Sequence, residues 1–172
     1  ALIFGILLAA TTAHAGTEVG NGGDAVICKN AAGSITSVYL YDYVEAAHRN
    51  IAIDLGGSSL NVNQKVELMI SRIERLNPTR ANQYRVWLKT FWDESALVYG
   101  SHLVDIPDTG WGVIPNGCEI EQFAIQMVPK FPSDKRYTIN GDIWNSKLLS
   151  DDHRAGLVMH ELILREATTA LS

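Results

Sequence analysis

The residues best suited to chemistry are His160 and Glu161, which are adjacent in an apolar stretch near the end of the chain. In zinc peptidases, two histidines four residues apart on a helix bind zinc, and a glutamate beside the first histidine polarises water. The second histidine would stand at Leu164. Because leucine cannot bind a metal, the sequence predicts no metal site and no cofactor. Zinc enters only under the alternative of a degenerate zincin-like hydrolase.

His153 and Gly156 form a row with His160 on one face of the same predicted helix. The missing side chain at Gly156 leaves a gap that a ligand or another backbone can approach. The two histidines are about 10 Å apart along the axis, too far to share one zinc ion. The row therefore indicates either a binding site at His153 and Gly156, or close helix packing at Gly156 with His153 in solvent.

Glu161 and Arg165 are four residues apart in the order that favours an ion pair along the helix, and this is the simplest interpretation. As the alternative, Glu161 acts as a catalytic acid, with His160 and Arg165 in the same site. A glycosidase would also need a second carboxylate across a cleft. The candidates for it are Asp105, Asp108, Glu119 and Glu121.

Trp111 stands between two glycines in the segment 108–112, whose composition is typical of a loop. An exposed tryptophan there can stack on a sugar or a peptide. We therefore count Trp111 among the candidate binding residues, whereas Trp87 and Trp92 follow a helical apolar stripe and fit the core.

Hydrophobic periodicity and turn residues predict the elements that position these side chains. An apolar helix extends from Ser150 to about Ala170 and is buried through its centre. A helical hairpin is expected on both sides of Asn77-Pro78, over 62–76 and 78–95. The other predictions are a helix over 37–49, a helical turn over 144–148, and strands over 24–28, 96–106, 118–128 and 137–139. The fold class is α+β, with helices packed on a small, mainly antiparallel sheet.

Composition limits the class of protein. Of 172 residues, 47% are hydrophobic, as in ordinary globular domains, so we expect a single domain over 16–172. With 14 basic against 19 acidic residues and no basic run, the chain lacks the charge pattern of a nucleic-acid binder. No segment is long and apolar enough to span a membrane.

The beginning of the chain indicates export. Residues 2–10 are apolar apart from one glycine, and Ala13-His14-Ala15 resembles a cleavage site, so residues 1–15 are predicted to be a signal peptide. We expect a secreted or periplasmic protein that begins at Gly16. Its two cysteines, Cys28 and Cys118, are then predicted to form a disulfide, and two separate buried thiols are the alternative.

Three motifs together resemble a group of uncharacterised secreted bacterial proteins. They are Gly22-Gly23-Asp24, Gly117-Cys118 before a strand containing Gln122, and His160-Glu161-x-x-x-Arg165-Glu166. The resemblance covers most of the mature chain and implies export and a shared domain, but no activity. In that group an aromatic residue is expected in place of Leu164, and the chain is expected to continue beyond the last helix.

These observations lead to two hypotheses. The first is an exported binding or envelope-interaction module with an unidentified cell-envelope or peptide ligand. The second is a hydrolase of peptide or cell-wall substrates that uses His160, Glu161 and Arg165. A water-filled cleft over His160 and Glu161 with a third polar group at hydrogen-bond distance would favour the hydrolase, and a sealed pair of Glu161 and Arg165 would favour the module.

Overall fold

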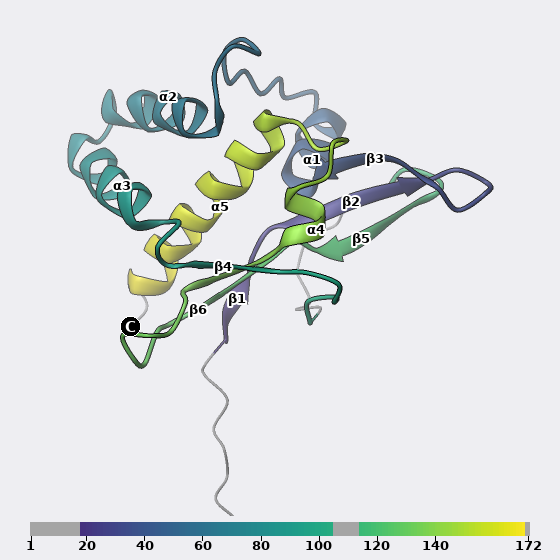
Figure 1. The fold of residues 1–172 in the computed structure, drawn as a ribbon. Coiled ribbons are helices and arrows are strands. Elements are labelled where there is room, and N and C mark those ends of the chain that lie inside the picture. The colour runs from purple at the N-terminus through teal and green to yellow at the C-terminus, as the bar shows by residue number, and fades with distance from the viewer. Residues whose placement is uncertain (1–17, 105–113, 171–172) are drawn as a thin grey trace, which may run out of the picture.

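The computed structural model describes residues 18–104 and 114–170. Within these ranges the chain forms five helices and two small, mainly antiparallel sheets (Figure 1). The predicted α+β class is confirmed. The predicted signal peptide, residues 1–15, and the candidates Asp105, Asp108 and Trp111 lie outside the described residues.

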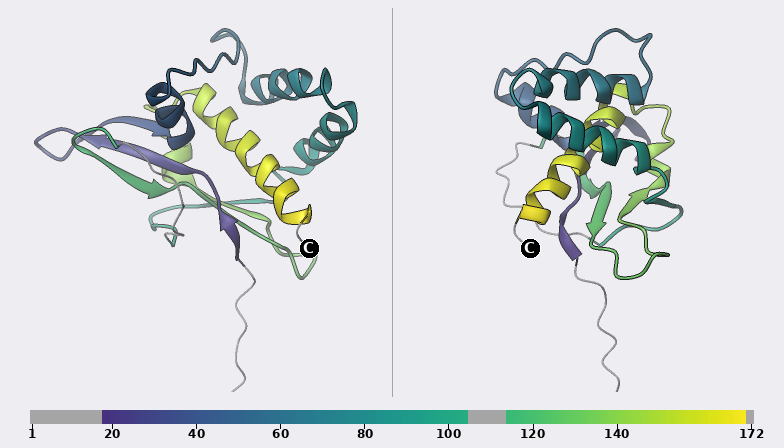
Figure 2. Two further views of the ribbon diagram at one scale, coloured as in Figure 1. Left: turned by 180° about the vertical axis from the view of Figure 1, so that it is seen from behind. Right: turned by 90° about the vertical axis from the view of Figure 1, so that its left-hand side faces the viewer.

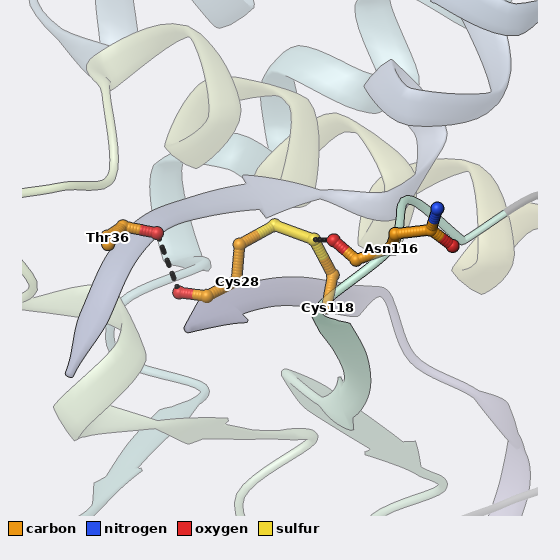
Figure 3. The surroundings of a disulfide bond; sticks show 4 residues. All are labelled: Cys28, Thr36, Asn116 and Cys118. Carbon is orange, nitrogen blue, oxygen red and sulfur yellow. Dashed lines mark hydrogen bonds between the residues drawn. A yellow bond between two sulfur atoms is a disulfide. The ribbon is translucent and has the colours of Figure 1, made fainter. Parts of the chain in front are cut away.

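The first sheet has three antiparallel strands in the order β3-β2-β5. The central strand β2 (Asp24–Lys29) pairs with β3 (Ile35–Leu40) and with β5 (Cys118–Gln122). In this register Cys28 lies opposite Cys118, and the two side chains form a disulfide across the strands (Figure 3). The predicted disulfide is confirmed.

The second sheet has four strands in the order β1-β6-β7-β4. They are β1 (Glu18–Asn21), β6 (Ala124–Met127), β7 (Tyr137–Asn140) and β4 (Ser95–Val98). The pairs β1–β6 and β6–β7 are antiparallel, and β4 runs parallel to β7.

Five helices accompany the sheets within the described ranges. They are α1 (Tyr41–His48), α2 (Val62–Glu74), α3 (Pro78–Thr90), α4 (Gly141–Trp144) and α5 (Asp151–Ala170). Asn61 and Gln64 form a capping box at the start of α2, and Asn77 caps α3 in front of Pro78. The α2–α3 pair forms the predicted hairpin, and α5 lies between this pair and the strands (Figures 1 and 2).

Two chain segments pass from one sheet to the other, and in each of them the strand is interrupted at the passage, which we call a sheet break. One breaks at Gly22-Gly23, between β1 and β2, and the other at Phe123, between β5 and β6. The N–H groups of Phe123 and Ala124 both donate to the Gly23 carbonyl at 3.0 Å, so the two breaks face each other. A Cβ at Gly23 would come within 2.6 Å of Leu157, because α5 packs directly on this point.

Several boundaries differ from the prediction. The predicted helix over 37–49 begins only at Tyr41, because the preceding residues pair with β2 as strand β3. The predicted strand over 96–106 extends only to Val98, and the one over 118–128 is divided by Phe123. Trp87 packs against the core as expected, whereas Trp92 keeps 38% of its surface exposed.

The core lies where α5 meets both sheets and the helical hairpin. Leu157, Val158 and Leu162 of α5 are fully buried there, together with Val66 of α2 and Tyr137 of β7. The predicted burial of the centre of α5 is confirmed. The polar residues of α5 must therefore find partners within the fold or at its surface.

Candidate functional site

Glu161 is completely buried where α5 crosses the break between β1 and β2. Its Oε1 accepts a hydrogen bond from the backbone N–H of Gly23 at 3.0 Å, and its Oε2 accepts one from Nε2 of Gln126 at 2.9 Å. The same Gln126 amide donates to the backbone carbonyl of Glu161 at 3.0 Å. This carboxylate therefore connects α5 to the sheet break and to β6.

Burial raises the pKa of Glu161, because the charged form loses its hydration. The charge of His160 and the hydrogen bonds from Gln126 and Gly23 act in the opposite direction, but the net shift is upward. A raised carboxyl pKa is common among catalytic acids, which also need contact with substrate. Glu161 has no exposed surface through which a substrate could make that contact.

Arg165 does not pair with Glu161, which corrects the expected i, i+4 ion pair. Its guanidinium donates to Glu94 Oε2 at 3.0 Å and to the Tyr137 hydroxyl at 3.3 Å, and it lies 4.8 Å from the ring centroid of Trp87. Arg165 therefore joins α5 to the segment after α3 and to β7.

His160 contacts helix α1. Its Nδ1 lies 3.0 Å from Oδ2 of Asp42, in the first turn of α1. The imidazole is partly exposed and borders a hollow of about 190 Å³ that Met69, Met159 and Ile163 also line. The consecutive residues His160 and Glu161 therefore connect α5 to different elements, one to α1 and the other to the sheets.

Gly156 is a packing position. A Cβ there would come within 2.7 Å of the Tyr43 ring and 2.8 Å of Leu40 Cδ2. The gap beside Gly156 is therefore filled by α1 and the end of β3. Of the two alternatives for this row, close helix packing is the one observed at Gly156.

His153 is half-buried and not surrounded by solvent, which corrects the other part of that alternative. Its Nδ1 accepts a hydrogen bond from the Leu40 N–H at 3.3 Å. Burial lowers the pKa of His153, and the charge of Asp152 only partly opposes this shift. The neutral ring with its proton on Nε2 is therefore the favoured form.

Beside His153 lies a hollow of about 490 Å³, which we call the tyrosine hollow. Its surface is largely apolar. The side chains that line it come from β3, from α1, from the start of α5 and from Pro115. The lining residues are Tyr39, Tyr43, Val44, Ala47, His48, Pro115 and His153. A volume of this size is typical of small-ligand sites.

Two of the four candidates for a second carboxylate, Glu119 and Glu121, lie among the described residues. Glu119 forms an ion pair with Lys29 across the β2–β5 pair. Glu121 accepts a hydrogen bond from Asn140 at 3.1 Å and lies 2.9 Å from Nδ1 of His102. Both carboxylates are engaged with residues other than Glu161, and the glycosidase pair stays a hypothesis.

Across 18–104 and 114–170, no group of three or more His, Cys, Asp or Glu side chains could hold a metal ion. None of the described helices is long and apolar enough to cross a membrane. Comparison with protein-family models, curated proteins and solved structures gives no match to this chain.

Sequence reasoning missed four residues that complete these sites: Asp42, Tyr39, Tyr43 and Gln126. A usable signal was present for Gln126, since a glutamine inside the apolar strand β6 indicates a buried polar partner. The tyrosines at positions 39, 41 and 43 alternate as in a strand, and this pattern alone indicates no ligand site. Asp42 carries no local signal, because its histidine partner is 118 residues away.

Proposed function

We propose that this chain is an exported binding module and that the tyrosine hollow is its ligand site. The observation that carries the proposal is the contrast between two sites on α5. The Glu161 carboxylate is sealed and hydrogen-bonded within the fold, whereas His153 borders an open, largely apolar hollow. Concave apolar sites with a few polar groups are the usual form of ligand pockets.

The tyrosine hollow has the composition of a recognition site. Tyr39 is 40% exposed, so its ring is accessible from solvent. His153 offers an Nε2–H donor beside it, because its Nδ1 is occupied by the Leu40 N–H. Aromatic surface with one directed donor supports binding of a partly apolar ligand, such as a peptide or an envelope component.

Export is a part of this proposal that rests on the amino-terminal pattern and on the disulfide. The bond between Cys28 and Cys118 is compatible with an oxidising compartment. We therefore place the module in the periplasm or outside the cell.

A hydrolase centred on Glu161 has less support. Such an enzyme would need the carboxyl to reach a scissile bond or an attacking water. In this fold that would require α5 to separate from Gly23 and Gln126, which would break the hydrogen bonds that the Glu161 carboxylate accepts from them.

The test is an amide NMR titration of the ¹⁵N-labelled protein with short peptides and soluble peptidoglycan fragments. We expect shifts that cluster at Tyr39, Ala47 and His153, and that disappear in Tyr39→Ala but persist in Tyr99→Ala. Tyr99 is a matched control, since it is 56% exposed and does not line the hollow. Shifts clustered elsewhere, or cleavage of these compounds that Glu161→Gln abolishes, would contradict the proposal.

A further inference from the structure

The rings that line the tyrosine hollow stand at steep angles to one another. The Tyr43 and His153 ring centroids are 4.5 Å apart with 63° between the planes, and those of Tyr39 and His153 are 5.5 Å apart with 72°. Rings in this arrangement do not stack into one flat surface. Val44 and Ala47 of α1 complete the wall, so the hollow is a notch with aromatic and aliphatic sides.

The tyrosine hollow offers a ligand no carboxylate, ammonium or guanidinium group. Among the described residues that line it, none is an aspartate, a glutamate, a lysine or an arginine. The Asp152 carboxylate, next in sequence to His153, is ion-paired with the buried Lys65 at 2.7 Å. A charged ligand group would lose its hydration in the hollow without gaining a partner of opposite charge. Charge complementarity therefore favours an uncharged ligand.

Backbone carbonyls around the hollow already accept hydrogen bonds within the fold. Those of the last turn of α1 accept from the N–H groups just beyond the helix at 2.8 to 3.1 Å, and they belong to Glu45, Ala46 and Ala47. The Pro115 carbonyl accepts from a backbone N–H at 3.1 Å, and the Asp152 carbonyl accepts from the Tyr43 hydroxyl at 3.0 Å. Apart from the exposed side chains of Tyr39 and His48, a ligand N–H would find few acceptors there.

His153 gives the hollow a directed donor. Its Nδ1 accepts the Leu40 N–H at 3.3 Å, so the ring proton lies on Nε2. Among the described residues, none accepts a hydrogen bond from this Nε2–H. The ring is half-buried, and a donor in such a place is satisfied by water or by an acceptor on a ligand. The hollow therefore suits a ligand that carries an oxygen acceptor.

The wall and the donor together define the ligand as an apolar body with oxygen acceptors and few N–H groups. An ordinary peptide carries one N–H at each residue, and each loses hydration where acceptors are scarce. Proline has no N–H, keeps its carbonyl and presents an apolar ring. Proline-rich segments also form the polyproline II helix before binding, so docking on an aromatic-lined groove costs little further ordering.

Resting on the proposed function, we infer that the tyrosine hollow binds a proline-rich peptide segment in the polyproline II conformation. One proline ring packs against Tyr39, and a carbonyl of the segment accepts the Nε2–H of His153.

The experiment compares hexaproline with hexaalanine, both acetylated and amidated so that neither carries a charge, by NMR titration of the ¹⁵N-labelled protein. We expect hexaproline to bind about tenfold more tightly, with amide shifts at Ala47 and His153. Equal affinities would overturn the inference but leave a peptide-binding module. Hexaproline shifts on another surface would also overturn it. If neither peptide binds, the inference fails, while the peptidoglycan fragments still test the proposed function.

Substitutions at one position test the role of the aromatic wall. Tyr39→Leu should weaken hexaproline binding several-fold, while Tyr39→Phe should retain it because the ring remains. Tyr39 is 40% exposed, so both variants are expected to fold, which amide spectra will check. Tyr99→Leu is the matched control, since Tyr99 is exposed outside the hollow and its loss should leave binding unchanged. Equal loss of binding in Tyr39→Leu and Tyr39→Phe would overturn docking on the ring.

The imidazole resonances of His153 test the hydrogen bond without any substitution. Bound hexaproline should slow the exchange of the Nε2 proton with water, because a ligand carbonyl replaces water as its acceptor. Hexaalanine at the same concentration should leave the exchange rate unchanged. Fast exchange of this proton in the presence of saturating hexaproline would overturn the role assigned to His153.

Discussion

The Glu161 carboxylate accepts a hydrogen bond at 3.0 Å from the backbone N–H of Gly23, 138 residues earlier in the chain. Gly23 lies where the chain leaves one sheet and enters the other, so its N–H falls outside both strand ladders. A buried N–H without a partner costs free energy. Glu161 therefore supplies from α5 the acceptor that the broken strand cannot provide.

Glu161→Ala should strongly destabilise the fold. The substitution removes the partner of the Gly23 N–H and one acceptor of Gln126, and each buried donor left without a bond is costly. We expect a loss of about 3 kcal/mol in the free energy of unfolding, measured by urea denaturation. Glu161→Gln should lose less, since the new amide oxygen can still accept from Gly23. Equal losses in the two variants would contradict this role for the carboxylate.

The stability of the protein should depend on pH through Glu161. Because the pKa of Glu161 is raised in the folded state, that state holds the proton more tightly than the unfolded chain does. This contribution is complete below the ordinary glutamate pKa and is lost as pH rises towards the folded value. Relative to Glu161→Gln, the unaltered protein should therefore lose stability on going from acid to neutral pH. Urea midpoints at a series of pH values measure the difference, and a constant difference would refute the predicted proton uptake.

Gly156→Ala should destabilise the contact between α5 and α1. The added methyl group would meet the Tyr43 ring at 2.7 Å and Leu40 at 2.8 Å, so the helices must separate. We expect a loss of about 2 kcal/mol, as for other overpacked sites. Gly57→Ala is the control, because a methyl group there meets only Ser59 Oγ at 3.8 Å. Thermal unfolding of both variants gives the comparison. An unchanged melting temperature for Gly156→Ala would show that α1 and α5 accommodate the methyl group without loss of stability.

Reduction of the disulfide should lower the melting temperature. The bond closes a segment with a sequence separation of 90 and joins β2 to β5 directly across the sheet. The chain-entropy model gives a contribution of about 4.5 kcal/mol for a loop of this size. The double variant Cys28→Ser with Cys118→Ser should match the reduced protein in calorimetry. If the two differ, the reductant acts on something other than this bond.

The amphipathic helices were predictable because their signals are local. Asn77 caps α3 as the sequence predicts, and the apolar run of α5 matches its buried centre. The secondary structure of residues 35–44 was harder to predict. Tyr39, Tyr41 and Tyr43 alternate as in a strand, while Val38, Tyr41 and Val44 have helical spacing. The chain uses both patterns in turn, and pairing with β2 sets the boundary at Tyr41.

The partners of the α5 side chains could not be predicted. Arg165, four residues after Glu161, is the partner that local helix geometry favours, and it belongs instead to Glu94, 71 residues earlier. The partners of Glu161 lie 138 and 35 residues away, at a sheet break and on β6. Such contacts depend on how the two sheets join, and periodicity within one helix carries no information about that.

The ion pair between Arg165 and Glu94 provides a test with the opposite pH dependence to that of Glu161. Burial raises the pKa of Glu94. The hydrogen bond from Thr90 and the interactions with Arg165 and Arg136 lower this pKa by more than burial raises it, so the net shift is downward. The stabilisation is therefore present above the ordinary glutamate pKa and is lost as pH falls. Relative to Glu94→Gln, the unaltered protein should gain stability from acid to neutral pH.

A double-mutant cycle with Arg165→Met and Glu94→Gln should give a coupling of about 1 kcal/mol at neutral pH, measured by urea denaturation. The coupling should shrink in acid, because protonation removes the charge of Glu94. A coupling near zero at neutral pH would mean that Arg165 acts through its contacts with Trp87 and Tyr137 and not through Glu94.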